Sequence, residues 1–124
     1  SGAIGQVTMS FDVWHHQMPH IEIYGTEGSL SLPDPNGFGG PVMVRGKSSD
    51  NWAEVPITTG RVDNGRGTGV IDMALGIRDG RPHLASGEMA FHVLDVMQSI
   101  LQASDEGESV PITSYAVRPE PIVT

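Results

Sequence analysis

The chain has 124 residues, a formal net charge of −8, no cysteine, 16 glycines and 9 prolines. This length predicts one domain with room for a core, and an acidic chain without a basic patch argues against nucleic acid and acidic membranes as partners. With 38% hydrophobic and 18% charged residues, the chain is too apolar for a disordered tail, and its apolar runs are too interrupted for a membrane span.

The missing cysteines exclude disulfides, thiolate catalysis and cysteine-based zinc sites in these residues. Disulfides are rare in reducing compartments, so their absence favours a cytoplasmic protein, and no charged, apolar-cored leader opens the chain. Ser1-Gly2 is interpreted as a cut end or the remnant of a tag.

Alternating apolar and polar residues predict several strands. Ile4 to Val13 shows this pattern, which indicates a strand covered on one face. His20 to Tyr24 and Ser29 to Leu32 flank the turn sequence Gly25-Thr26-Glu27-Gly28 and predict an antiparallel hairpin. Further strands are predicted over Val42–Arg45, Trp52–Ile57 and Val110–Tyr115, with a loop over Pro33–Pro41.

Two helices are predicted between the last two of these strands. Thr68 is the expected N-cap of a helix over Val70–Asp79, and Gly80 is its stop signal. Ser86 is expected to cap a longer helix, from Gly87 to about Ala103. Its apolar face is expected to be Met89, Val93, Val96, Met97, Ile100 and Leu101, and its solvated face Glu88, His92, Asp95, Ser99 and Gln102.

Strands in a run followed by helices in a run predict an α+β domain with an open sheet that is antiparallel or mixed, and mostly antiparallel. We expect the helices to cover one face of this sheet. The other face carries moderately polar side chains and is expected to be open for self-association, with Thr8, Ser10, His20, Glu22 and Tyr24 on it.

Three of the five histidines are candidates for metal ligands. His15, His16 and His20 cluster near a strand end, but on an extended chain His15 faces away from the other two. Three-point coordination would need a sharp local turn, so no metal site is predicted. Glu88, His92 and Asp95 lie at helical spacings, which is typical of a solvated helix face.

The motifs give little support to a serine nucleophile or to a nucleotide-binding loop. No serine stands in a Gly-x-Ser-x-Gly elbow. Gly65-Arg66-Gly67-Thr68-Gly69 lacks the Gly-x-Gly-x-x-Gly spacing and its strand context, and is interpreted as a flexible approach to a helix. Arg66, beside a helix N-terminus, could still bind a carboxylate, a phosphate or a sugar hydroxyl.

Several ordered stretches resemble the C-terminal domain of the Gfo/Idh/MocA oxidoreductases, the family of glucose-fructose oxidoreductase and inositol dehydrogenase. The matching stretches include His20-Ile21-Glu22-Ile23-Tyr24-Gly25-Thr26-Glu27-Gly28-Ser29-Leu30, Gly67-Thr68-Gly69-Val70-Ile71-Asp72-Met73-Ala74, Arg81-Pro82-His83-Leu84-Ala85-Ser86-Gly87-Glu88 and His92-Val93-Leu94-Asp95-Val96-Met97.

The resemblance implies a two-domain NAD(P)-dependent dehydrogenase of sugars, cyclitols or related polyols. Residues 1–119 would be its substrate-binding and oligomerisation domain, truncated at its N-terminal side, and residues 120–124 a tail. An N-terminal Rossmann domain, which this sequence lacks, would bind NAD or NADP. No catalytic residue and no cofactor are expected here, and the chain alone is expected to be inactive.

By the same resemblance, His15, His16 and Gln17 lie on the segment that faces the nicotinamide side, and Arg66 lies at the approach to the first helix. These four are the predicted substrate-binding residues. The expected partners are the Rossmann domain, a polyol and further copies of the chain. A second hypothesis remains open, that of a free-standing, non-catalytic binding or assembly module.

Overall fold

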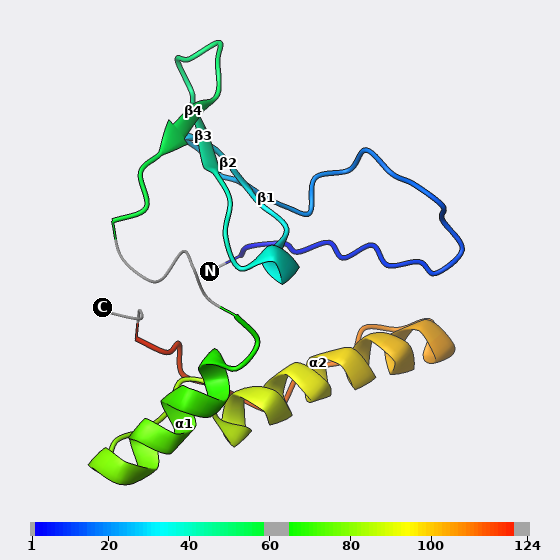
Figure 1. Cartoon of the computed structure of the whole chain (residues 1–124). Coiled ribbons are helices and arrows are strands. Elements are labelled where there is room, and N and C mark those ends of the chain that lie inside the picture. Colours follow the sequence, from blue (N-terminus) through cyan, green and yellow to red (C-terminus); the bar gives the residue numbers. More distant parts are fainter. Residues whose placement is uncertain (1, 59–64, 121–124) are drawn as a thin grey trace. The chain divides into compact units, whose positions relative to one another are not determined.

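The computed structural model describes residues 2–58 and 65–120 and divides the chain into two units, Ser1–Pro56 and Ile57–Thr124. Figure 1 shows strands in the first unit and helices in the second, and each unit is described by itself. The predicted α+β class is confirmed. Of the tail predicted at 120–124, residues 121–124 lie outside the described residues.

The first unit is built on a four-stranded antiparallel sheet of order β1-β2-β3-β4. The strands are β1 (Ile21–Tyr24), β2 (Gly28–Leu32), β3 (Val42–Gly46) and β4 (Ala53–Val55). The predicted hairpin is confirmed, and the backbone N–H of Gly25 donates to the carbonyl of Gly28 at 2.8 Å to close it. The predicted loop after β2 contains one short 3-10 helix, η1 (Pro35–Gly37).

The register separates the side chains of the sheet into two faces. Residues directly opposite each other in an antiparallel pair lie on the same face, so the pairs Ile23↔Leu30 and Leu30↔Val44 place apolar residues together. The apolar face carries Ile21, Ile23, Leu30, Leu32, Val42, Val44, Ala53 and Val55. The opposite, polar face carries Glu22, Tyr24, Ser29, Ser31, Met43, Arg45 and Glu54.

The strand predicted over Ile4–Val13 is absent from the structure. These residues form no regular secondary structure and are exposed, with Phe11 at 102% and Met9 at 84% of their reference areas. The alternation describes which side chains would share a face, but a strand exists only when its backbone groups are paired. Thr8 and Ser10 therefore do not share the polar face with Glu22 and Tyr24 in this structure.

A close backbone approach joins β2 to β3. Gly28 and Gly46 are paired in register, and a Cβ added to Gly28 would lie 2.5 Å from the carbonyl oxygen of Arg45 and 3.0 Å from the Cα of Gly46. Both of these atoms belong to the backbone and cannot swing away. Only glycine fits at position 28 without moving β3.

Helix α1 (Thr68–Asp79) opens the described part of the second unit. The cap position is held by Gly67, not by Thr68 as predicted, because the Thr68 hydroxyl turns back and donates to the Gly65 carbonyl at 2.7 Å. Gly80 ends the helix as predicted: it is left-handed, with φ 65°, and its N–H donates to the carbonyl of Gly76.

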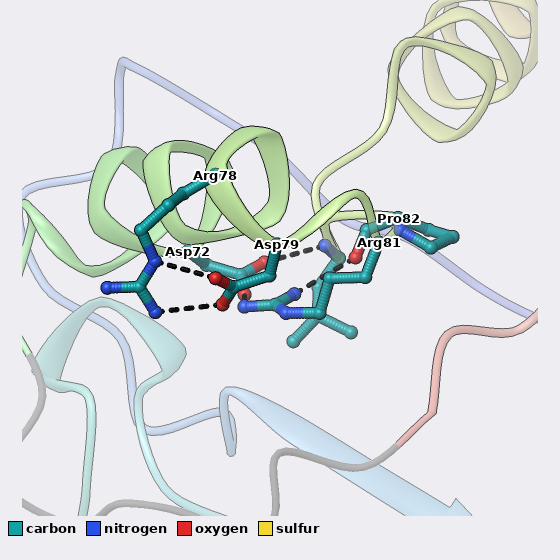
Figure 2. Close-up of polar contacts among 6 residues, drawn as sticks. Asp72, Arg78, Asp79, Arg81 and Pro82 are labelled. Atoms are coloured by element: carbon teal, nitrogen blue, oxygen red, sulfur yellow. Dashed lines mark hydrogen bonds and ion pairs between the residues drawn. The ribbon is translucent and has the colours of Figure 1, made fainter.

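The connection after α1 is fastened by Asp72. Its carboxylate accepts hydrogen bonds from the Leu84 backbone N–H at 2.8 Å and from the Arg81 guanidinium at 2.8 Å. Figure 2 shows Asp72 and Arg81 in this connection. These bonds, first the one from Leu84, lower the pKa of Asp72. Beside it, Arg78 and Asp79 form a two-point ion pair. One carboxylate on α1 thus fixes the chain where it turns toward the next helix.

Helix α2 (Gly87–Glu106) begins and ends as the sequence indicates. The Ser86 side chain accepts a hydrogen bond from the Met89 N–H, which confirms the predicted N-cap. Gly107 ends the helix in the left-handed conformation with φ 68°, one turn later than the predicted boundary at Ala103. No helix of the described residues combines the length and the apolarity needed to cross a membrane.

The strand predicted over Val110–Tyr115 is also absent. Instead, Figure 1 shows the chain returning along α2 after Gly107, in orange to red. Three residues of the polar face of α2, which was predicted to be solvated, are covered or half-buried, namely His92, Asp95 and Ser99, while Glu88 and Gln102 on the same face are exposed. Ser99 is only 8% exposed, whereas Val93, Met97, Ile100 and Leu101 on the apolar face are each more than half exposed.

We predict that Gly28→Ala destabilises the sheet at the pairing of β2 with β3, whereas Gly46→Ala does not. An added Cβ at position 28 must push backbone atoms apart, which typically costs about 1–3 kcal/mol, whereas a Cβ at position 46 meets no atom within 4 Å. Thermal unfolding followed by far-UV circular dichroism measures the difference. Equal melting temperatures of the two variants would show that β3 yields freely at this position.

Candidate functional site

The predicted substrate-binding residues fall in two places. His15, His16 and Gln17 lie on the exposed segment that leads into β1, and Arg66 lies in the turn just before α1. The first three belong to the first unit and Arg66 to the second. That all four serve one substrate remains a prediction.

One polar cluster forms where the chain enters β1. The rings of His16 and His20 meet edge to face with centroids 5.9 Å apart. The Nε2 atom of His20 lies 3.7 Å from Oδ2 of Asp34, and both side chains are half exposed. Asp34 also accepts a hydrogen bond from the Asn36 backbone N–H at 2.8 Å, which holds the carboxylate at the start of η1.

This cluster, His16, His20 and Asp34, offers hydrogen-bond donors and acceptors at one place. An imidazole presents a donor and an acceptor and a carboxylate presents acceptors, which is the combination that a hydroxyl-bearing ligand needs. The sequence analysis named His16 as a substrate-binding residue and His20 as one of the clustered histidines, but it did not name Asp34. Asp34 is fourteen positions beyond His20 and comes close to that histidine because β1 and β2 form a hairpin.

A metal ion has no set of ligands at this place. Among residues 2–58 and 65–120, no three His, Asp or Glu side chains are grouped closely enough to hold a metal ion. An open hollow of about 440 Å³ lies nearby in sequence, lined by Phe11, Asp12, Val13 and Trp14. These are four consecutive residues of one exposed segment, so the hollow is a bend in the chain and brings no separate functional groups together.

Just before α1, the glycine-rich stretch forms a turn. The Thr68 N–H and hydroxyl both donate to the Gly65 carbonyl, at 3.1 and 2.7 Å. The stretch follows no strand of a parallel βαβ unit in the described residues, since the sheet is antiparallel. It therefore does not have the context of a dinucleotide loop, and its interpretation as the approach to a helix holds.

A second polar cluster, which the sequence pattern did not indicate, joins α2 to the returning segment. The Nδ1 atom of His92 lies 2.8 Å from the Ser114 hydroxyl oxygen, and the Ser114 N–H donates to Oδ2 of Asp95 at 3.0 Å. Ser114, through its side chain first and then its backbone N–H, lowers the pKa of Asp95. We call His92, Asp95 and Ser114 the clasp.

The Ser114 hydroxyl can donate to the Nδ1 atom of His92 or accept from it, depending on which ring nitrogen of the imidazole carries the proton. In either tautomer, the clasp bonds the returning segment to α2 through a side chain and a backbone N–H.

Simple lengths explain why Ser114 meets His92. From His92 to Gly107 the helix rises about 22 Å at 1.5 Å per residue. Seven extended residues from Gly107 to Ser114 reach about 23 Å at 3.3 Å per residue. A chain that reverses at Gly107 and runs straight back therefore brings Ser114 beside His92. The match between these two lengths could have predicted the contact from the sequence.

Comparison with known proteins identifies the class of protein to which this fold corresponds. Residues 1–112 match the family model described as the oxidoreductase family, C-terminal alpha/beta domain. No curated protein and no solved structure matches the chain.

The match covers nearly the whole chain, so the protein belongs to the Gfo/Idh/MocA oxidoreductase family through its C-terminal domain. The resemblance noted from the ordered sequence stretches is confirmed. A general role as a domain of an oxidoreductase follows from this membership.

The family is generally NAD(P)-dependent, and the described residues can be tested for a dinucleotide site. Such a site needs a parallel strand, a glycine-rich turn and a helix N-terminus aimed at the pyrophosphate. The described sheet is antiparallel, and the turn at Gly65–Gly69 follows no such strand. The described residues therefore do not form a Rossmann-type dinucleotide site.

We predict that the clasp makes stability depend on pH in the acid range. The folded pKa of Asp95 is lowered, so its contribution is present above the unfolded pKa, near 3.8, and is lost as the pH falls through the lower folded value. The melting temperature should therefore fall more between pH 5 and about pH 3 in the wild-type chain than in Asp95→Asn.

The control is Asp105→Asn, which removes an exposed carboxylate from the same helix. This variant should keep the wild-type acid dependence. A slope in Asp95→Asn as steep as that of Asp105→Asn would show that the carboxylate of Asp95 does not fasten the segment.

Proposed function

We propose that this domain binds the substrate of an NAD(P)-dependent oxidoreductase that acts on sugars, cyclitols or related polyols. NAD or NADP is bound by a separate Rossmann domain of the same enzyme, and the present chain is inactive alone. The observation that carries the proposal is the family match over residues 1–112. The lack of cysteine supports placing the enzyme in the cytoplasm.

The chemistry at the start of β1 supports a polyol as the ligand. Each sugar hydroxyl both donates and accepts, so a polyol site needs both kinds of group close together. His16, His20 and Asp34 supply them within one short stretch of structure, and Gln17, whose amide does both, lies between the two histidines in sequence. Arg66, in the turn before α1, is proposed separately as a charged donor to the substrate.

We also propose that the protein assembles into a dimer or larger oligomer through the polar face of the sheet. Ser29 and Ser31 give this face short hydroxyl side chains along β2, and the Tyr24 hydroxyl donates to the Glu22 carboxylate within the face. Short hydroxyl side chains are compatible with close approach of a second copy.

We predict that Gln17→Ala and Arg66→Ala, made in the full-length enzyme, raise KM for the polyol about tenfold each. Losing one hydrogen bond to an uncharged or charged partner weakens binding by roughly 1–3 kcal/mol. Steady-state kinetics with the nicotinamide signal give KM and kcat, and circular dichroism shows that the domain remains folded.

Gln6→Ala and Arg118→Ala serve as matched controls, because they remove the same side-chain types at exposed positions outside the segments that lead into β1 and α1. Both controls should leave KM unchanged. If Gln17→Ala and Arg66→Ala behave like the controls, neither residue binds the substrate.

We predict that the chain is an oligomer and that Ser31→Arg shifts it toward the monomer. Ser31 lies at the centre of the polar face, paired with Glu22 and Met43, and a long charged side chain there would separate two stacked sheets. Multi-angle light scattering measures the mass. Ser109→Arg, an exposed position outside the sheet, is the control, and a monomeric wild type at high concentration would contradict the assembly.

The alternative, a free-standing binding or assembly module, differs in what the gene encodes ahead of these residues. The enzyme requires a strand, a Gly-x-Gly-x-x-Gly turn and a helix, followed by a Glu-Lys-Pro segment. Reading the upstream coding sequence decides between the two. A stop codon or a signal peptide directly before this stretch would favour the module.

A further inference from the structure

The loop between β2 and β3 closes on itself at the end of the sheet where His20 meets Asp34. Antiparallel pairing brings the start of β1, the end of β2 and the start of β3 to this one end. Residues 33–40 form the loop there, drawn in cyan in Figure 1. A Cβ added to Gly40 would lie 2.7 Å from the Cβ of Pro33, so the two ends of the loop are in close contact. Compact loops of this kind are frequently functional.

Phe38 is the strained residue of this loop. Among residues 2–58 and 65–120 it is the only residue other than glycine with a positive φ, 60°. This left-handed conformation crowds the Cβ atom of a bulky side chain. Glycine adopts it without strain, and glycines stand on both sides, at positions 37 and 39. What phenylalanine adds at position 38 is therefore its ring.

Phe38 is held in place and still accessible. It is 38% exposed, compared with 63% for Phe91 and 102% for Phe11, so most of the residue is covered and the rest faces solvent. Its backbone N–H donates to the carbonyl of Pro35 at 3.5 Å and caps the C-terminal end of η1. An aromatic side chain that is already held loses little conformational freedom when a ligand packs against it.

The same short turn carries the carboxylate that faces His20. Asp34 and Phe38 are the two caps of η1, and the Gly37 N–H donates to the Asp34 carbonyl at 3.0 Å. Four residue steps at about 2.0 Å each separate the two caps by about 8 Å along the turn. A single small ligand can therefore reach both residues.

We infer that Phe38 is a specificity-determining residue, whose ring packs against the C–H face of a cyclic polyol while His20 and Asp34 bond its hydroxyls. The inference rests on the proposed function and narrows the ligand to a ring. A sugar or cyclitol ring has hydroxyls at its rim and C–H groups on its faces, and the negative face of an aromatic ring attracts such C–H groups. An open-chain polyol has no fixed face of this kind and gains less from the aromatic ring.

NMR titrations of the full-length enzyme with myo-inositol, glucose and sorbitol test this role. Phe38→Leu keeps an apolar side chain and the same crowding at Cβ but removes the aromatic face. Its Kd for the preferred cyclic compound, myo-inositol or glucose, should rise about five- to tenfold, and its Kd for the open-chain sorbitol should change less. Phe38→Tyr restores the aromatic face and should restore the wild-type Kd.

Phe91→Leu, at an exposed position on α2, is the matched control and should bind as the wild type does. The inference is overturned if Phe38→Leu binds like this control, if Phe38→Tyr fails to restore the affinity, or if binding of sorbitol weakens equally. The last result would show that the loop has moved. A wild-type enzyme that binds none of the three compounds would overturn the proposed polyol function, and this inference with it.

Discussion

The antiparallel register of β1 to β4 is the constraint on which the first unit depends. Because Gly28 has no side chain, β2 can lie close to the backbone of Arg45 and Gly46 on β3 in this register. The register then sorts apolar residues to one face and serines with Glu22 and Tyr24 to the other. It also brings Asp34, after β2, next to His20, before β1, so the candidate binding cluster is a consequence of strand pairing.

In the second unit, two carboxylates fix the path of the chain after each helix. Asp72 on α1 accepts from the chain that follows that helix, and Asp95 on α2 accepts from the chain that follows the second. In both cases an acidic side chain bonds a backbone N–H more than ten residues later. Such charge-assisted bonds are stronger than neutral ones, and they direct the return of the chain. Val93, Met97, Ile100 and Leu101 on the apolar face of α2 stay more than half exposed.

Local signals in the sequence predicted much of this fold. The hairpin around Gly25–Gly28, the Ser86 N-cap and the left-handed Gly80 are all confirmed, because each depends on residues within a few positions of one another. The strands predicted at Ile4–Val13 and Val110–Tyr115 were wrong for a common reason. Alternation reports side-chain polarity, whereas a strand requires a backbone partner that the local sequence does not name.

For the candidate site, the ordered stretches indicated the family that the comparison confirmed. No local pattern placed Asp34 beside His20. His92 and Asp95 were wrongly predicted to be solvated, because the pattern did not show that Ser114 returns to them.

By itself, then, the sequence determined the hairpin, the helix ends, the α+β class and the family of this protein, since caps, turns and periodicity are local. Only the tertiary structure decided that Asp34 meets His20 and that Ser114 meets His92 and Asp95. The physical reason is that these pairings depend on where the chain reverses and how far it then runs. A path of that kind is a property of the fold and not of any short stretch of residues.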